Sequence, residues 1–166
     1  HIHHKYEVYY EIEGSRRYFI EDAAYIVNAG CVVLIGENQI HKTAALGDGA
    51  SSRIVVNFSR EYLDKITDLF PEVDFFSFLS EEHNHLLSTI TVKQQNHIHG
   101  ILQQLLTLQE ETSPEADAMR KMLLATLLLC GGIILTQARA LNAMSMGEEY
   151  ALHVGVSVRR VKLTVM

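Results

Sequence analysis

A chain of 166 residues is long enough for one domain with its own core, or for one domain with a helical extension. Hydrophobic residues make up 48% of the chain and charged residues 20%, which is typical of folded proteins and excludes a disordered chain. The formal net charge of −6 argues against a nucleic-acid-binding surface, which normally carries clustered lysine and arginine. Two cysteines far apart in the sequence argue against a disulfide framework and favour the cytoplasm.

The sequence contains no segment that is expected to cross or enter a membrane. Its longest apolar run, residues 122–135, is shorter than the roughly 20 residues that a bilayer requires, and it contains two glycines. No signal peptide is visible. Because the first residue is His1, we expect the sequence to be a piece of a longer protein.

The first 58 residues read as short strands separated by turn signals. Gly14-Ser15 predicts a hairpin turn after the first strand, and Asn28-Ala29-Gly30 a later break. Six strands at this spacing favour an antiparallel barrel or sandwich over a βαβ sheet. They are expected at residues 6–13, 18–21, 24–27, 31–35, 40–45 and 53–58, with one further short strand within 85–90.

After Ser59 the hydrophobic period changes, which predicts helices. Ser59 is a suitable N-cap for a helix over 60–69. Thr91 and Gln94 have the spacing of a capping box for a helix over 92–111, and Ser113-Pro114 opens a third helix over 114–140.

The third helix is apolar on nearly every side, so one barrel face cannot bury it all. We therefore expect a second copy of the chain to cover the rest, with Leu105 and Leu127 at the interface. Residues 141–166 stay unassigned, because their alternating valines suit either a bulged strand or a linker. No helix-turn-helix pattern is present there.

Two histidines and a glutamate near the start of the chain share one strand face. Side chains alternate along a strand, so His1, His3 and Glu7 point the same way. With His41 brought alongside by a barrel, they form a ligand set that suits a divalent transition metal. A metal-free polar pocket, with Glu7 hydrogen-bonded inside the barrel, is the alternative. A third interpretation is that the segment HIHH is partly a tag remnant.

Other side chains of the barrel strands are weaker candidates. Tyr9 and Tyr18 either line a small-molecule pocket or pack in the barrel core. Arg53 either anchors a ligand carboxylate or lies exposed on its strand. Glu11 and Glu13 are expected to face outward or to lie near the rim. No Ser/His/Asp order, glycine-rich phosphate loop or CxxC pair appears, so nothing indicates nucleophilic catalysis.

Taken in order, these motifs resemble the N-terminal sensory domain of AraC-type transcriptional regulators. The chain has HIHHKYEVYYEIEG, then YIVNAGCVVLIGENQIH, then RIVVNFSREYLD. The first two segments also resemble the two cupin motifs, and SPEADAMRKMLLATLLL resembles the helical region of those regulators. The resemblance covers roughly residues 1–140. The chain departs from it in having Ala29-Gly30-Cys31 where Pro-Gly-Asp is usual, and in its last 26 residues.

The resemblance implies a mainly β fold with C-terminal helices. A cupin-like jelly-roll barrel would span residues 1–90 and a helical dimerisation region 91–140, followed by the tail 141–166. The chain would form a homodimer through the helices at 92–111 and 114–140, and a separate module, absent here, would contact DNA. A small-molecule effector, such as a sugar, would bind in the barrel against His1, His3, Glu7, Tyr9, Tyr18 and His41.

The alternative function is a small cupin metalloenzyme, an oxygenase or an isomerase. It would use His1, His3, Glu7 and His41 as metal ligands. The absence of catalytic partner residues favours the sensor, for which a divalent transition metal is the one candidate cofactor.

Overall fold

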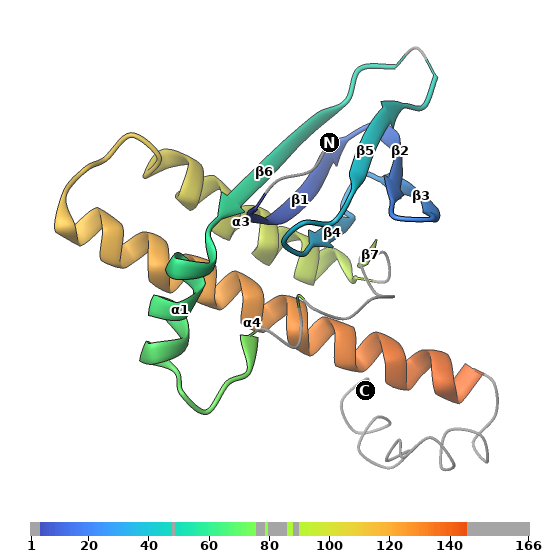
Figure 1. Ribbon diagram of the computed structural model, residues 1–166. Helices are drawn as coiled ribbons and strands as arrows, with labels where there is room; N and C mark the ends of the chain where they lie inside the picture. The colour runs from blue at the N-terminus through green and yellow to red at the C-terminus, as the bar shows by residue number, and fades with distance from the viewer. Residues whose placement is uncertain (1–3, 48, 76–78, 80–85, 88–89, 146–166) are drawn as a thin grey trace.

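The computed structural model describes residues 4–47, 49–75, 79, 86–87 and 90–145, and of 86–87 and 133–145 only the backbone. Strands come first in the chain and the long helices last (Figure 1). This confirms a mainly β class with C-terminal helices. The elements are β1 (Tyr6–Glu13), β2 (Ser15–Ile20), β3 (Ala23–Asn28), β4 (Val32–Ile35), β5 (His41–Ala45), β6 (Ser52–Phe58), α1 (Arg60–Leu69), β7 (Leu86–Leu87), α3 (Val92–Thr107) and α4 (Pro114–Ser145).

The described strands form two antiparallel sheets that face each other. One sheet has the order β6-β1-β4-β7 and the other the order β3-β2-β5. The chain passes between the two sheets repeatedly, which is how a jelly-roll barrel closes its core without long connections. The predicted cupin-like architecture is thereby confirmed.

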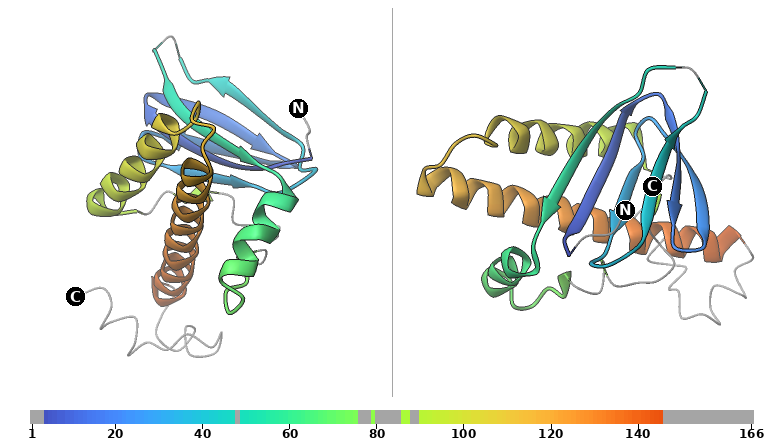
Figure 2. Two further views of the ribbon diagram at one scale, coloured as in Figure 1. Left: turned by 90° about the vertical axis from the view of Figure 1, so that its left-hand side faces the viewer. Right: turned by 45° about the horizontal axis from the view of Figure 1, so that its top comes forward.

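Strand β1 is buried on both faces because each face meets a different layer. Tyr6, Val8 and Tyr10 belong to a core cluster that includes helix residues such as Leu102. Tyr9 lies on the opposite face, in a second cluster with residues of the other sheet. The molecule therefore has three layers, with the helices on one side of the β6-β1-β4-β7 sheet and the second sheet on its other side (Figure 2).

The helices begin where the sequence predicts. The Ser59 side chain accepts a hydrogen bond from the backbone N–H of Tyr62, which caps α1. Thr91 and Gln94 form a complete capping box at the start of α3. Helices α3 and α4 run antiparallel beside each other (Figure 1). Within the described residues, no helix combines the length and the apolar character needed to cross a membrane.

The structure corrects several predicted boundaries. Helix α3 ends at Thr107 and not at residue 111, because the chain turns where Arg120 donates hydrogen bonds to the carbonyls of Leu108 and Glu111. Helix α4 ends at Ser145 and not at residue 140, because no glycine or proline interrupts residues 141–145. Residues 146–166 lie outside the described residues.

The hairpin between β1 and β2 is tighter than predicted and starts β2 at Ser15. Gly14 has a φ of +86°, a left-handed conformation that glycine adopts at little cost. A Cβ atom at this position would lie 2.6 Å from the carbonyl oxygen of Ala50. Only glycine therefore allows the β1–β2 turn to pack against the segment that precedes β6.

We predict that Gly14→Ala lowers the free energy of unfolding by about 1–3 kcal/mol, through left-handed strain and the contact with Ala50. Gly100→Ala is the matched control, because its added methyl group meets nothing within 4 Å and it lies inside α3. The control should raise stability by about 0.5–1 kcal/mol. Urea denaturation measures both changes, and equal effects of the two substitutions would contradict this account of the hairpin.

Candidate functional site

The candidate site lies between the two sheets, on the face of β1 that carries its odd-numbered residues. Because paired residues on neighbouring strands share a face, the register extends this surface to β4, β6 and, across the barrel, to β2 and β5. We call this surface the barrel interior. Its polar side chains are those of Glu7, Tyr9, Glu11, Arg16, Tyr18, His41, Thr43, Arg53 and Asn57.

Glu7 is the centre of the first polar group in the barrel interior. The Tyr18 hydroxyl donates a hydrogen bond of 2.7 Å to Glu7 Oε1. His41 Nε2 lies 3.8 Å from Glu7 Oε2, and His41 Nδ1 lies 2.9 Å from the carbonyl oxygen of Gln39. Three of the six predicted ligand-binding residues, Glu7, Tyr18 and His41, therefore meet in one buried group.

Glu11 forms the second polar group and corrects a prediction. The sequence predicted that Glu11 faces outward or lies near the barrel rim, but its side chain is 0% exposed. The sheet continues past residue 9 because the backbone of Glu11 exchanges hydrogen bonds with Gly30 and Cys31, so Glu11 keeps the inward orientation of Tyr9. The Tyr9 hydroxyl donates to Glu11 Oε2. Glu11 Oε1 accepts no hydrogen bond from any described residue. Glu13 is exposed, as predicted.

Aromatic rings link the two polar groups. The rings of Tyr9 and Tyr18 meet edge to face with centroids 5.1 Å apart, and those of Tyr18 and His41 stack at 6.1 Å. Burial raises the pKa of both tyrosine hydroxyls well above the usual range, and the neighbouring carboxylates raise it further. The charge of Arg53 opposes this shift at both tyrosines. Both phenols are therefore neutral donors at any physiological pH.

The barrel interior is accessible along β6. Arg53, Val55 and Asn57 are exposed, although their partners on β1 are buried. Arg16 lies on the facing sheet, where it donates hydrogen bonds to Ser51 and Thr43, and its Nε has no partner among the described residues. A ligand that enters beside β6 would meet arginines at the edge and carboxylates deeper inside.

Sequence reasoning missed Glu11 and Arg16. The signal that identifies Glu11 was available, since Glu7, Tyr9 and Glu11 alternate on one strand. Arg16 gave no such signal, because its position depends on where the hairpin places the start of β2.

The predicted metal site combines residues inside and outside the described part of the chain. Among the described residues, no group of three His, Cys, Asp or Glu side chains could hold a metal ion. Glu7 and His41 lie close together, whereas His1 and His3 lie outside the described residues. The contact of His41 Nδ1 with a backbone carbonyl is the type of support that metal-binding histidines commonly have. The described residues thus supply two of the four predicted ligands.

We predict that the buried tyrosines make the protein sensitive to alkali. The native state keeps the protons of Tyr9 and Tyr18 at a pH where the unfolded chain releases its own, so the stability they contribute is complete below pH 10 and is lost above it. The free energy of unfolding should fall by up to about 1.4 kcal/mol per pH unit for each tyrosine. In the double variant Tyr9→Phe/Tyr18→Phe, the free energy of unfolding should decline less steeply with pH. Urea denaturation at several pH values between 9 and 11 measures this slope. An unchanged slope would contradict the assignment.

Solved structures that are similar to this chain include the following three. An apo variant of ToxT from Vibrio cholerae strain SCE256 is 13% identical, with a TM-score of 0.51, over 75% of this chain and 46% of that chain. ToxT from the same strain, bound to an unsaturated fatty acid, is 16% identical with a TM-score of 0.50, over 75% and 45%. The AraC-like activator CuxR is 9% identical with a TM-score of 0.48, over 76% and 43%. The chain thus spans less than half the length of these proteins.

At such low identity the two ToxT structures support the fold alone. No curated protein matches the chain by sequence. The sequence model of the family "AraC-like ligand binding domain" matches residues 1–128, which include both sheets and most of the described helices. The chain therefore belongs to the family of AraC-like ligand-binding domains.

Proposed function

We propose that this chain is the effector-sensing domain of an AraC-type transcription regulator and that the effector binds in the barrel interior. The observation that carries the proposal is the pair of buried carboxylates, Glu7 and Glu11, on the inner face of β1. A buried carboxylate oxygen without a donor is costly, and Glu11 Oε1 has none among the described residues. A bound ligand would supply the missing donor.

The chemistry of the barrel interior favours a ligand with several hydroxyl groups, such as a sugar. Carboxylates accept hydrogen bonds from neighbouring hydroxyls, and the rings of Tyr9 and Tyr18 offer apolar surfaces for the carbon skeleton. We assign ligand contacts to Glu7, Tyr9, Glu11, Tyr18 and His41. His1 and His3 would complete the site from the segment that precedes β1.

A fatty acid is the second candidate, because one similar ToxT structure holds an unsaturated fatty acid. Its carboxylate would be repelled by Glu7 and Glu11 deep in the barrel interior. Arg53, exposed on β6, and Arg16 on the facing sheet could bind that carboxylate near the edge. The two candidates therefore require different residues.

We predict that a panel of monosaccharides contains a ligand that raises the melting temperature of this chain. Glu11→Gln should weaken its binding by at least about tenfold, because a charge-assisted hydrogen bond is lost. Glu13→Gln, on an exposed position of the same strand, is the matched control and should bind as the wild type does. Calorimetric titration gives the affinities.

The same variants separate the candidates. If the protein binds oleate, and this binding is unaffected by Glu11→Gln but lost in Arg53→Gln, the effector is a fatty acid and not a sugar. Failure of both ligand classes to bind would contradict an effector site in the barrel interior.

We propose a sensor and not an enzyme, and a cupin metalloenzyme with a His/Glu metal site is the alternative. Glu7 and His41 would supply two ligands and His1 and His3 two more. Metal analysis of purified protein tests the alternative: near-stoichiometric iron, nickel or manganese that is lost in His3→Ala would favour a cupin metalloenzyme.

DNA binding would belong to a part of the regulator other than this chain, since a net charge of −6 is unfavourable for binding nucleic acid. The effector would act by binding more tightly to one of two arrangements of the barrel and helices. The two cysteines of the chain are free, which suits the reducing cytoplasm where such a regulator would work.

We also propose that the chain forms a homodimer through α3 and α4. Exposed apolar side chains remain on these helices after the barrel is covered: Met119 is 51% exposed, Met122 59% and Leu106 50%. Met119 and Met122 are spaced to lie on one face of α4. A second copy of this chain would remove this surface from water.

If the chain forms this dimer, a charged side chain at an exposed apolar position of α4 should prevent dimer formation without unfolding the chain. Met122→Glu should convert dimers to folded monomers in sedimentation experiments, because an ionised carboxylate cannot be buried at low cost in an apolar interface. Leu127, expected at the interface from sequence, is only 4% exposed within one copy, so a charge there would disrupt the core instead. Arg17→Glu, at an exposed position of β2 in the sheet that lies far from the helices, is the control. An unchanged oligomer in Met122→Glu would contradict this interface.

A further inference from the structure

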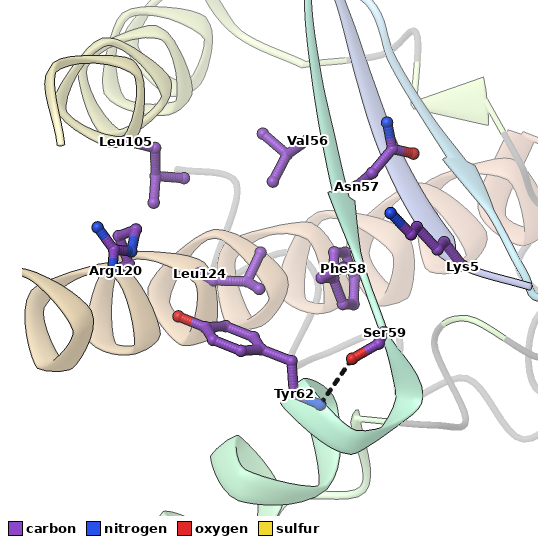
Figure 3. Close-up of a pocket in the computed structure, with 9 residues that line it drawn as sticks. All are labelled: Lys5, Val56, Asn57, Phe58, Ser59, Tyr62, Leu105, Arg120 and Leu124. Atoms are coloured by element: carbon purple, nitrogen blue, oxygen red, sulfur yellow. Dashed lines mark hydrogen bonds between the residues drawn. The ribbon is translucent and has the colours of Figure 1, made fainter. Parts of the chain in front are cut away.

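A pocket lies outside the barrel, where β6 meets the helices. It has a volume of about 340 Å³, which is in the range of small-molecule sites. Its apolar wall consists of Val56 and Phe58 from β6, Leu105 from α3 and Leu124 from α4. Figure 3 shows these side chains around the pocket, with Tyr62 of α1 along one side. We call it the helix-side pocket.

The charged side chains that line the helix-side pocket are positive, whereas the whole chain is negatively charged. Among the residues that line it, Lys5 and Arg120 are charged and none is acidic, although the chain has a net charge of −6. The two cations lie at opposite ends of the pocket (Figure 3). An apolar wall with positive ends complements a ligand that has an apolar body and an anionic group.

Arg120 is held in place before any ligand binds. Its Nη1 donates hydrogen bonds to the carbonyl oxygens of Leu108, at 2.9 Å, and Glu111, at 2.6 Å. Asp117 is 3.6 Å from Arg120 Nη2, but it makes a closer ion pair, of 2.6 Å, with Lys121. The charge of Arg120 is therefore fixed at the pocket and only partly offset by Asp117.

Tyr62 adds a hydroxyl group at the same end of the pocket. Its side chain points toward Arg120 (Figure 3). Burial raises the pKa of the Tyr62 phenol, so it stays protonated and can donate a hydrogen bond. A guanidinium and a phenol together form a suitable site for one carboxylate.

We propose that the helix-side pocket binds a small amphipathic carboxylate. The apolar body would lie against Val56, Phe58 and Leu124, and the carboxylate would bind Arg120 and Tyr62. Such a ligand would contact the barrel through β6 and the helical layer through α1, α3 and α4 at once. The site is separate from the proposed effector site, because Val56 and Phe58 point to the opposite face of β6 from Arg53 and Val55.

Decanoate is the probe, used below its aggregation concentration, and decanol is the neutral comparison. We expect calorimetric titration of the whole chain to give saturable decanoate binding and at least about tenfold weaker decanol binding. Arg120→Gln should weaken decanoate binding about tenfold. Because Arg120 also holds the turn after α3, Tyr62→Phe is the second variant: it keeps the ring and should weaken binding about fivefold. Arg17→Gln, exposed on the far sheet, is the control.

The outcomes are distinct. The site is supported if decanoate binding is lost in Arg120→Gln, reduced in Tyr62→Phe and unchanged in Arg17→Gln. All variants must also melt cooperatively, which shows that they are folded. No saturable binding, or binding unchanged by both variants, overturns it. Binding that is lost in Arg53→Gln instead would place the carboxylate in the barrel interior and would also overturn this proposal. Sugar binding in the barrel is measured separately, so its failure does not affect this result.

Discussion

The burial of β1 on both faces is the constraint on which the rest of the fold depends. One face must be covered by helices and the other by a second sheet, and the alternation of side chains assigns each residue to one of them. A slip of one residue in register would place Glu7 and Glu11 among the helices and Tyr6 and Val8 in the barrel. Because the apolar side chains of one face must be buried against the helices, the carboxylates are placed on the other face, in the barrel interior.

The sequence predicted the local structure well wherever a chemical signal marks it. The helix starts are specified by Ser59, by Thr91 with Gln94, and by Ser113-Pro114. The side chains of Ser59, Thr91 and Ser113 accept hydrogen bonds from backbone N–H groups of the first turn, and Pro114 has no N–H group that needs a partner. Helix ends were less predictable, since the end of α3 depends on Arg120, twelve residues beyond Leu108. Tertiary contacts of this kind leave no pattern in the local sequence.

The candidate site was predictable in part, for the same reason. Spacing identified Glu7, and its meeting with Tyr18 and His41 follows from the barrel topology. The inward position of Glu11 follows from the same alternation, although charged side chains are usually exposed. Arg16 and the helix-side pocket could not be found from spacing, because they depend on how β2, β6 and the helices meet in space.

Strand β6 is the element through which the barrel interior and the helix-side pocket can affect each other. Arg53, Val55 and Asn57 face the interior, while Val56 and Phe58 face the helices, and Phe58 stacks on Tyr6 of β1 with ring centroids 5.6 Å apart. Since successive residues of a strand move together, a displacement of β6 by an occupant of one side reaches the other. Two ligands that favour the same position of β6 would then strengthen each other's binding by the same factor, as linkage requires. A barrel ligand could thus bias the helical layer without touching it.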